Sequence, residues 1–394
     1  MDDYKKEREN LDIIKRSKLT HPNILLATGS LIRGNVYSLY FEAAKYDLDK
    51  YLRSPDTSIP SDAISVHTFL GRFLDLIDAL RFLHNELVPV GNNESLRFFH
   101  LDLKPTNIMV FIDDSEKWKI HDFGMSRVSN RHHQTRGWER ILPTTIAKTS
   151  SSGTTVNRSG SFLAPETHLR MDSDMGKVNA KSDVWSLGCI LSLVISFLDQ
   201  GPQGIDLFEK KRKSVANIIT DHFFVENGRG KHVLNPGVTD WFKELEERFR
   251  QSLGKDSRVL LAIRRIIYLL KNNILLIKSE GRASAQEMKK LFGEILQQLN
   301  TRQPLKSSDI IPTKGPLDRL RLLRSKEDKA PREPSKQFTQ SPSPKDQGSP
   351  GSPTVENTLD FCLPKPYPFI RYGACSRRTR QRLRGWLAVA VSLD

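Results

Sequence analysis

Three side chains of different chemistry lie close together in the stretch HLDLKPTNIMV, residues 100–110. Asp102 supplies a carboxylate, Lys104 a cation and Asn107 an amide, and the apolar run 108–112 that follows is typical of a buried strand. On a loop held by such a strand, these groups can bind a phosphate and its metal ion. A surface turn is the alternative, because Asp, Asn and Pro are ordinary turn formers.

The segments around this loop predict a mixture of helices and short strands. Apolar residues recur at helical spacing in several segments, and elsewhere two apolar runs flank a short turn. We expect a helix at 4–19, a hairpin at 24–42 around the turn RGN, an amphipathic helix at 66–87, a short strand in KWKIHDFG that runs into a Gly turn, a buried apolar helix at 183–198, and further helices up to residue 299.

The chain has 394 residues and a formal net charge of +15, and most of that charge lies near its C-terminal end. Residues 301–394 contain 18 Lys and Arg and 9 Asp and Glu, a net charge of +9, which leaves +6 for residues 1–300. Beyond residue 303 the helical pattern fails, and SPSPKDQGSPGSP is low-complexity sequence. We therefore expect residues 304–394 to be a disordered tail.

The cysteines and the apolar runs predict the environment of the protein. Its three cysteines have neither metal-ligand nor CxxC spacing, which favours a reducing compartment. No signal core and no apolar run of the ~18 residues that span a membrane is present, so we expect a soluble protein, cytoplasmic or nuclear. The basic stretch 377–386 could attract nucleic acid or an acidic membrane, but we favour a solvated tail without a specific nucleic-acid partner.

Four separated motifs carry a family resemblance. HLDLKPTN resembles a catalytic loop, DFG at Asp122–Gly124 a metal-binding turn, APE at Ala164–Glu166 the end of an activation segment, and DVWSLG at Asp183–Gly188 a buried central helix. Each motif alone is weak, but in this order the chain resembles the eukaryotic protein kinase superfamily. Lys104 followed by Pro105 is similar to its serine/threonine branch.

The resemblance implies an α+β, protein-kinase-like fold whose small N-terminal lobe is incomplete. Residues 1–45 would be the remnant of that lobe, with the helix called C in this family, two strands and the hinge. Residues 46–303 would form a mostly helical C-terminal lobe, followed by the tail at 304–394.

The resemblance also implies phosphoryl transfer from ATP to a Ser or Thr hydroxyl of a protein substrate. Asp102 would accept the proton of that hydroxyl, and Lys104 would neutralise charge on the phosphoryl oxygens. Asn107 and Asp122 would hold Mg²⁺, which prefers oxygen ligands. ATP and Mg²⁺ are therefore the expected cofactors.

Other residues would support these groups. His100 belongs to the catalytic loop, and the resemblance pairs Glu166 with Arg282, because a buried charge needs a partner. Asp183 would cap the backbone of the catalytic loop. An ordinary N-cap of the apolar helix is the other interpretation of Asp183.

The nucleotide side of the site is harder to assign. SLYFEAAKYDLDKYL resembles the hinge, with Phe41 at the back of the adenine pocket and backbone groups of Glu42 and Ala44 facing the base. A hydrophobic strand followed by a turn looks the same. Glu7 is our choice for the glutamate that pairs with the ATP-binding lysine of the family, and Glu9 is the alternative.

One departure from the family pattern concerns regulation. Leu101 replaces the Arg that pairs in most members with a phosphorylated activation-segment residue, so control through that ion pair is not expected. The segment 124–162 is long and rich in Ser and Thr. We favour a solvated loop over a set of phosphosites.

A second departure is that the chain contains no Gly-rich phosphate loop and no lysine-bearing strand ahead of residue 4. We expect an active kinase that has lost these strands through fragment cloning or a misplaced start, so that this chain alone is weakly active or inactive. A kinase-like binding or scaffold module is the first alternative, and an unrelated metal-dependent phosphotransferase or hydrolase is the second.

Overall fold

The computed structural model describes residues 2–90, 95–130, 160–167, 179–214, 221–254 and 257–301, together with the backbone of 389–392. All of these residues fall in one unit, Met1–Arg319 with Trp386–Asp394. The Ser- and Thr-rich stretch at 131–159 and most of the expected tail lie outside the described residues.

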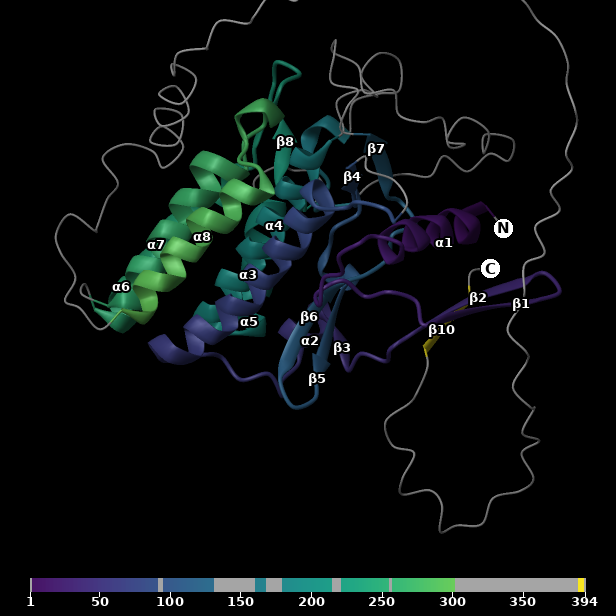
Figure 1. Ribbon diagram of the computed structural model, residues 1–394. Coiled ribbons are helices and arrows are strands. Elements are labelled where there is room, and N and C mark those ends of the chain that lie inside the picture. Colours follow the sequence, from purple (N-terminus) through teal and green to yellow (C-terminus); the bar gives the residue numbers. More distant parts are fainter. Residues whose placement is uncertain are drawn as a thin grey trace, which may run out of the picture. The chain divides into compact units, whose positions relative to one another are not determined.

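The described residues form long helices and mostly short strands (Figure 1). The helices are α1 (Asp2–Lys15), α2 (Leu48–Arg53), α3 (Ala63–Asn85), α4 (Ala180–Gln200), α5 (Pro202–Ser214), α6 (Pro236–Leu253), α7 (Arg258–Leu269) and α8 (Ala285–Asn300). The strands are β1 (Gly29–Arg33), β2 (Val36–Phe41), β3 (Tyr46–Asp47), β4 (Leu96–Phe99), β5 (Ile108–Ile112), β6 (Glu116–Ile120), β7 (Arg127–Asn130), β8 (Phe224–Glu226), β9 (His232–Leu234) and β10 (Val389–Ser392).

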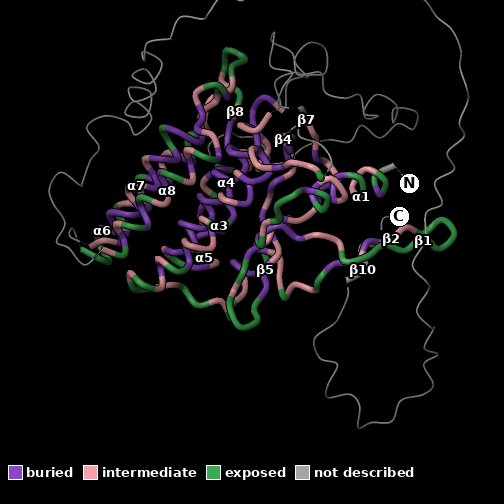
Figure 2. Tube along the Cα trace, viewed as in Figure 1, coloured by how far each residue is buried: buried purple, intermediate pink, exposed green. Residues whose placement is uncertain are grey.

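Helix α4 is the centre of the helical part. Every residue in 182–198 is buried, and Figure 2 shows the helix mostly in the colour of buried residues. Asn179 caps its first turn by accepting a hydrogen bond from the Lys181 N–H, so the helix begins earlier than the sequence pattern predicts. Among the described helices, α4 alone is long and apolar enough to cross a membrane, and 94% of its most apolar window is buried inside the protein.

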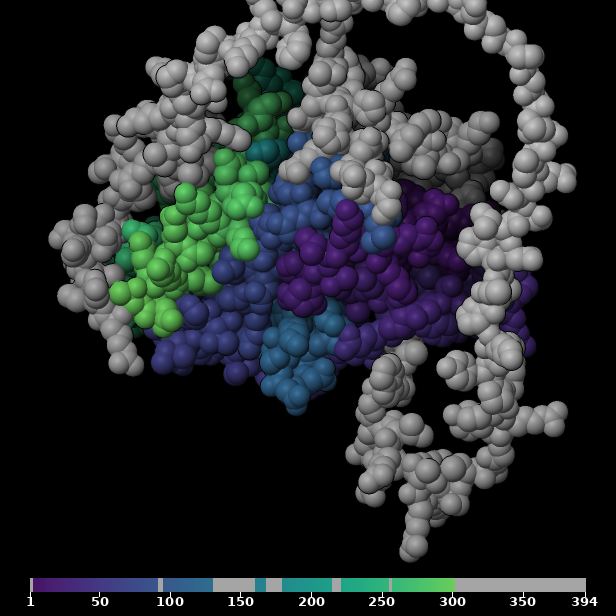
Figure 3. All heavy atoms as spheres, viewed as in Figure 1, coloured from purple at the N-terminus to yellow at the C-terminus, as the bar shows by residue number. Residues whose placement is uncertain are grey.

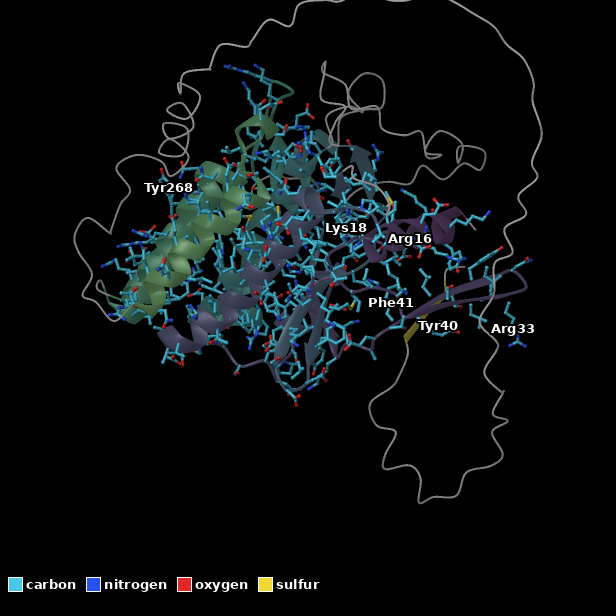
Figure 4. The ribbon with its side chains drawn as sticks, in the orientation of Figure 1. Arg16, Lys18, Arg33, Tyr40, Phe41 and Tyr268 are labelled. Atoms are coloured by element: carbon cyan, nitrogen blue, oxygen red, sulfur yellow. The ribbon has the colours of Figure 1, made fainter. Side chains whose placement is uncertain are left out.

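Strands β1 and β2 form the hairpin that the sequence predicts at 24–42. Gly34 begins its two-residue turn with a φ of +60°, which glycine adopts without strain and which suits a tight turn between twisted strands. The hairpin projects from the rest of the described protein: in Figure 4, Arg33 lies at its tip, and Phe41 lies at the end nearer the helices.

Two elements pack against this hairpin. Strand β10 pairs antiparallel with residues 38–41 of β2, which gives a three-stranded sheet in the order β1-β2-β10. Helix α1 lies on the sheet, where the ring centroids of Tyr4 and Tyr37 are 5.1 Å apart. Figure 3 shows the N-terminal residues, in purple, in direct contact with the blue residues that follow them in the chain.

A second small sheet, in the order β3-β5-β6, positions the predicted site. Strands β5 and β6 are antiparallel, with Ile108 opposite Ile120. The residue before β5 and the residue after β6 therefore lie at the same end of the sheet, and the His121 N–H donates to the Asn107 carbonyl oxygen at 2.9 Å. This register brings two segments of the predicted site side by side.

The fold class is the predicted α+β arrangement, with α1 and the β1–β2 hairpin in a small part and a mainly helical larger part. The domain boundary between residues 45 and 46 stays a prediction. Within the expected tail, the structure describes a strand at 389–392.

Candidate active site

Asp183, in the first turn of α4, organises the backbone of the predicted catalytic loop. Its buried carboxylate accepts hydrogen bonds from the N–H groups of His100 at 2.9 Å and Leu101 at 2.7 Å, and His84 Nε2 lies 2.9 Å from its Oδ2. The N-cap of α4 is Asn179, so interpreting Asp183 as an ordinary N-cap is wrong. These bonds hold Leu101 at a φ of +65°, a conformation that costs a non-glycine residue ~1–3 kcal/mol.

The first three side chains singled out in the sequence meet at one carboxylate oxygen. Lys104 Nζ lies 2.7 Å from Asp102 Oδ2, and Asn107 Nδ2 donates to the same oxygen at 3.0 Å. Asn107 Nδ2 also donates to the Asp102 backbone carbonyl at 2.9 Å, which ties the two ends of the loop together. The Asp102 side chain is 25% exposed, so a hydroxyl group can reach it.

Asp122 lies in the turn that follows β6. Its backbone has a φ of +65°, and its Oδ1 accepts a hydrogen bond from the Gly124 N–H at 3.2 Å. Phe123 anchors this turn because it is fully buried, with its ring centroid 5.7 Å from that of Phe98 and 5.2 Å from that of His100. The turn is therefore fixed by an apolar anchor next to a partly exposed carboxylate.

The oxygen donors at this end of the sheet fit Mg²⁺. Asn107 Nδ2 donates to Asp102, so the Oδ1 of the same amide group is not used in that hydrogen bond. Asp122 adds a carboxylate from the adjacent segment. Mg²⁺ is commonly held by one or two protein oxygens, water and substrate phosphates. Among the described residues, no group of three or more His, Cys, Asp or Glu side chains could hold a metal ion instead.

Helix α1 contributes Glu7 to this end of the site. Burial, together with the nearby Asp122 carboxylate, raises the pKa of Glu7 to about 7. Glu9, the alternative from the sequence, is exposed. Of the two glutamates, only Glu7 faces the interior of the protein.

Asn10 is a site residue that our sequence reasoning missed. It is buried, and its Nδ2 donates to the Phe123 carbonyl oxygen at 2.7 Å, so it joins α1 to the DFG turn. Asn10 follows Glu7 by three residues and therefore lies on the same face of the helix. That spacing is the signal that could have found it.

The predicted hinge residues follow β2. Phe41 is buried, and its ring lies 4.7 Å from that of His121 in an edge-on arrangement. Glu42 Oε2 lies 2.7 Å from Lys119 Nζ on β6, and Ala44 is half-buried. Whether backbone groups of Glu42 and Ala44 face a base stays a prediction.

His121 is a second residue that our sequence reasoning missed. It lies between the Phe41 ring and Asp122, and burial lowers the pKa of its imidazole although the Asp122 carboxylate opposes this. His100 Nε2 lies 2.9 Å from the backbone carbonyl oxygen of His121. His121 therefore connects the catalytic loop, the DFG turn and the hinge strand.

Glu166 and Arg282, which the resemblance pairs, meet in the helical part. Arg282 donates from Nη1 and Nη2 to the two carboxylate oxygens at 2.7 and 2.8 Å, and the Ser182 hydroxyl also donates to Glu166 at 2.7 Å. The Arg282 Nε donates to the Leu276 carbonyl at 2.7 Å. The buried ion pair is thus hydrogen-bonded on both partners, which offsets much of its desolvation cost.

A further polar link, not evident from the sequence, holds the segment just before Glu166. Ser161 donates its hydroxyl hydrogen to the Asp221 carboxylate, and Arg212 Nε donates to the Asp221 carbonyl oxygen at 2.9 Å. The Arg212 guanidinium lies 4.3 Å from the ring centre of Phe208 and 4.5 Å from that of Phe223. This link joins residues 160–167 to α5.

The chain resembles known proteins over most of its described residues. The protein kinase domain matches residues 2–290. CBL-interacting protein kinase 15 of Oryza sativa subsp. japonica is 34% identical over 140 residues, 35% of this chain and 25% of that protein. A putative leucine-rich repeat receptor-like serine/threonine-protein kinase of Arabidopsis thaliana is 27% identical over 263 residues, 66% of this chain and 24% of that protein.

A third relative is the serine/threonine-protein kinase SSN3 of Chaetomium globosum, 26% identical over 181 residues, which are 46% of this chain and 29% of that protein. The chain therefore matches about a quarter of the length of these relatives.

Proposed function

Because the chain belongs to the protein kinase family, we propose that it acts as a serine/threonine protein kinase, which transfers the γ-phosphate of ATP to a hydroxyl group of a protein. The observation that carries this proposal is the Asp102 carboxylate, bound by Lys104 at 2.7 Å and by Asn107 at 3.0 Å. The names of two relatives, both serine/threonine-protein kinases, support the same branch of the family.

In this proposal Asp102 orients the hydroxyl of the substrate and accepts its proton. Its Oδ1 makes no hydrogen bond that involves Lys104 or Asn107, so it is available to the substrate. Lys104 lies next to Asp102 with 40% of its side chain exposed, and it neutralises negative charge on the transferred phosphoryl group. In the same step, Asp102 thus accepts a proton and Lys104 neutralises negative charge.

Asn107 Oδ1 and the Asp122 carboxylate are the groups that would hold Mg²⁺ bound to ATP. When bound, the ion neutralises charge on the phosphates. The hydrogen bonds of Asn107 to Asp102 and of His121 to Asn107 keep both segments in register without the ion. The chain itself therefore pre-positions these two oxygen donors.

In this proposal, residues 1–394 supply one side of a nucleotide site. That side consists of Phe41 and the segment after it, Asn107 and Asp122. Ahead of α1, residues 1–394 contain no Gly-rich loop and no lysine for Glu7. We expect this chain alone to bind Mg-ATP weakly and to transfer phosphate slowly. A binding or scaffold module is the alternative function.

Sensitive detection of phosphate transfer separates these two functions. The chain 1–394 is incubated with Mg-ATP labelled at the γ-phosphate and a mixed Ser/Thr substrate protein, as wild type, as Asp102→Asn, and as Asp113→Asn. Asp113 is exposed beyond β5, so its variant is a matched control for loss of a carboxylate. We expect slow transfer that Asp102→Asn abolishes and that Asp113→Asn leaves unchanged.

Transfer that survives Asp102→Asn would contradict the proposed role of this carboxylate. Failure to bind Mg-ATP, even with excess nucleotide, would favour the binding module. Amide protection in α4 shows in both cases whether the variants are folded.

A further inference from the structure

Strand β10 pairs with the edge of β2 opposite β1, and no other strand among the described residues pairs with that edge. Its residues pair antiparallel with β2, with Val389 opposite Phe41 and Val391 opposite Leu39. We propose that this strand, near the C-terminal end of the chain, completes the small sheet in cis and that its removal opens the β2 edge to exchange and to foreign strands. This inference does not depend on the proposed kinase function.

The directions of the backbone groups in β2 show which of them need β10. The Thr28 N–H donates to the Tyr40 carbonyl at 2.7 Å, so the backbone groups of Tyr40 point toward β1. Backbone groups of successive strand residues point to opposite edges. Those of Leu39 and Phe41 therefore point toward β10.

The hairpin packs against helix α1, and a third strand adds to that support. An isolated two-stranded hairpin is at best marginally stable in water, and three strands or packing on a helix are needed. Leu31, Ile32 and Val36 are 50–53% exposed, so about half of the surface of these side chains stays in contact with water. An unpaired edge of β2 would add a site for aggregation.

The sequence near the C-terminal end suits this position. Residues 386–391, WLAVAV, form an uncharged apolar run with two β-branched valines, and they follow the basic stretch 377–384. The rest of 304–394 is rich in Pro, a residue type that is depleted in strands. Because the run belongs to the same chain, its effective concentration at the β2 edge is high, which favours pairing in cis over pairing with a second copy.

Proline substitutions test the pairing residue by residue. Val391 lies opposite Leu39, so its N–H points toward β2, whereas the N–H of Ala390 points away. Val391→Pro removes a ladder hydrogen bond, and Ala390→Pro is a matched control, since proline is tolerated where the N–H faces outward. Amide hydrogen exchange of Leu39 and Phe41 in the full chain is the readout.

We expect the Leu39 and Phe41 amides to exchange at least about ten-fold faster in Val391→Pro and in a chain ending at residue 385, with Ala390→Pro like the wild type. The Tyr40 amide, which faces β1, should change less. A synthetic peptide of residues 386–394 should restore protection to the shortened chain. Unchanged amides in α4 show that the helical part is still folded.

Two outcomes would overturn the proposal. Equal exchange of the Leu39 and Phe41 amides in all four proteins would mean that β10 does not protect this edge. Protection that is lost on dilution, together with a dimer in size-exclusion chromatography, would mean that the strand comes from a second copy.

Discussion

Two residues of the site, Leu101 and Asp122, have a left-handed backbone with a φ of +65°. Asp and Asn tolerate this conformation much better than Leu does. Hydrogen bonds from the catalytic loop to Asp183 compensate the strain at Leu101, whereas Asp122 stabilises its own turn through Gly124. The two segments are therefore held by different means, and substitutions in them should have different effects.

Asp122→Asn should remove the negative charge of this side chain and keep the structure of the turn. Asn tolerates a positive φ and still offers an oxygen to the Gly124 N–H, so the free energy of unfolding should change by less than about 1 kcal/mol. A neutral amide is a weaker ligand for Mg²⁺ than a carboxylate, so the Mg²⁺-dependent part of ATP binding should be lost. Urea unfolding and calorimetry with and without EDTA measure the two effects.

The control for this substitution is Asp122→Ala, which loses both the charge and the hydrogen bond of the turn. It should destabilise the protein as well as abolish metal-dependent binding. Wild-type Mg²⁺-dependent binding by Asp122→Asn would show that this carboxylate does not hold the ion.

Glu7 predicts a dependence of stability on pH. Its pKa rises from 4.5 to about 7 in the folded protein, so the folded protein keeps a proton that the unfolded chain has already lost. Stability therefore falls as the pH rises from about 4.5 to 7. Glu7→Gln removes this titration and should raise the free energy of unfolding by about 1–3 kcal/mol at about pH 8, with little change near pH 4.

Urea unfolding of the wild type and of Glu7→Gln across this pH range measures the effect. Glu9→Gln is the matched control, because Glu9 lies on the same helix and is exposed. If Glu7→Gln shows the same stability difference from the wild type at both ends of the range, Glu7 does not keep a proton in the folded protein.

At the scale of elements, the ion pair of Glu166 and Arg282 joins the segment at 160–167 to the loop before α8. Glu166→Ala or Arg282→Ala should each lower the free energy of unfolding by about 3–5 kcal/mol, because each leaves a buried charge without its partner. The double variant should lose less than the sum of the two single losses. Denaturation of all four proteins measures this coupling, and strict additivity would exclude it.

Glycines in two helices make a contrasting pair. A Cβ atom at Gly188 in α4 would lie 2.3 Å from Ile274 Cγ2, whereas a Cβ at Gly293 in α8 meets no atom within 4 Å. Gly188→Ala should therefore destabilise the protein by about 1–3 kcal/mol, and Gly293→Ala should stabilise it by about 0.5–1 kcal/mol. Thermal unfolding checks both signs. Equal effects of the two substitutions would mean that α4 and the segment around Ile274 are not close-packed.

At the scale of the whole molecule, the expected weak binding of Mg-ATP is itself a prediction. Tight binding by a kinase needs backbone amides over the phosphates and a lysine on them, and residues 1–394 supply neither ahead of α1. Isothermal titration of the chain with Mg-ATP should give an affinity clearly weaker than micromolar. Micromolar affinity with measurable transfer would show that residues 1–394 are sufficient for nucleotide binding and phosphate transfer.

The catalytic loop could be predicted from the sequence because its groups are local. Asp102, Lys104 and Asn107 lie within six residues, directly before an apolar run, and a short loop leaves their side chains few places to go. The hairpin at 24–42 was predictable for the same reason, since strand propensity and a glycine turn act over short distances. The pair of Glu166 and Arg282, 116 residues apart, was predictable only through the family resemblance.

Other features depended on the tertiary structure. The burial of Glu7 but not of Glu9, the bond of Asn10 to the DFG turn and the pairing of β10 with β2 all depend on which face of an element is covered by a distant one. Helical spacing shows which residues share a face, but it does not show what that face meets. A buried polar group must find a partner, and only the packing of all elements decides which partner is within reach.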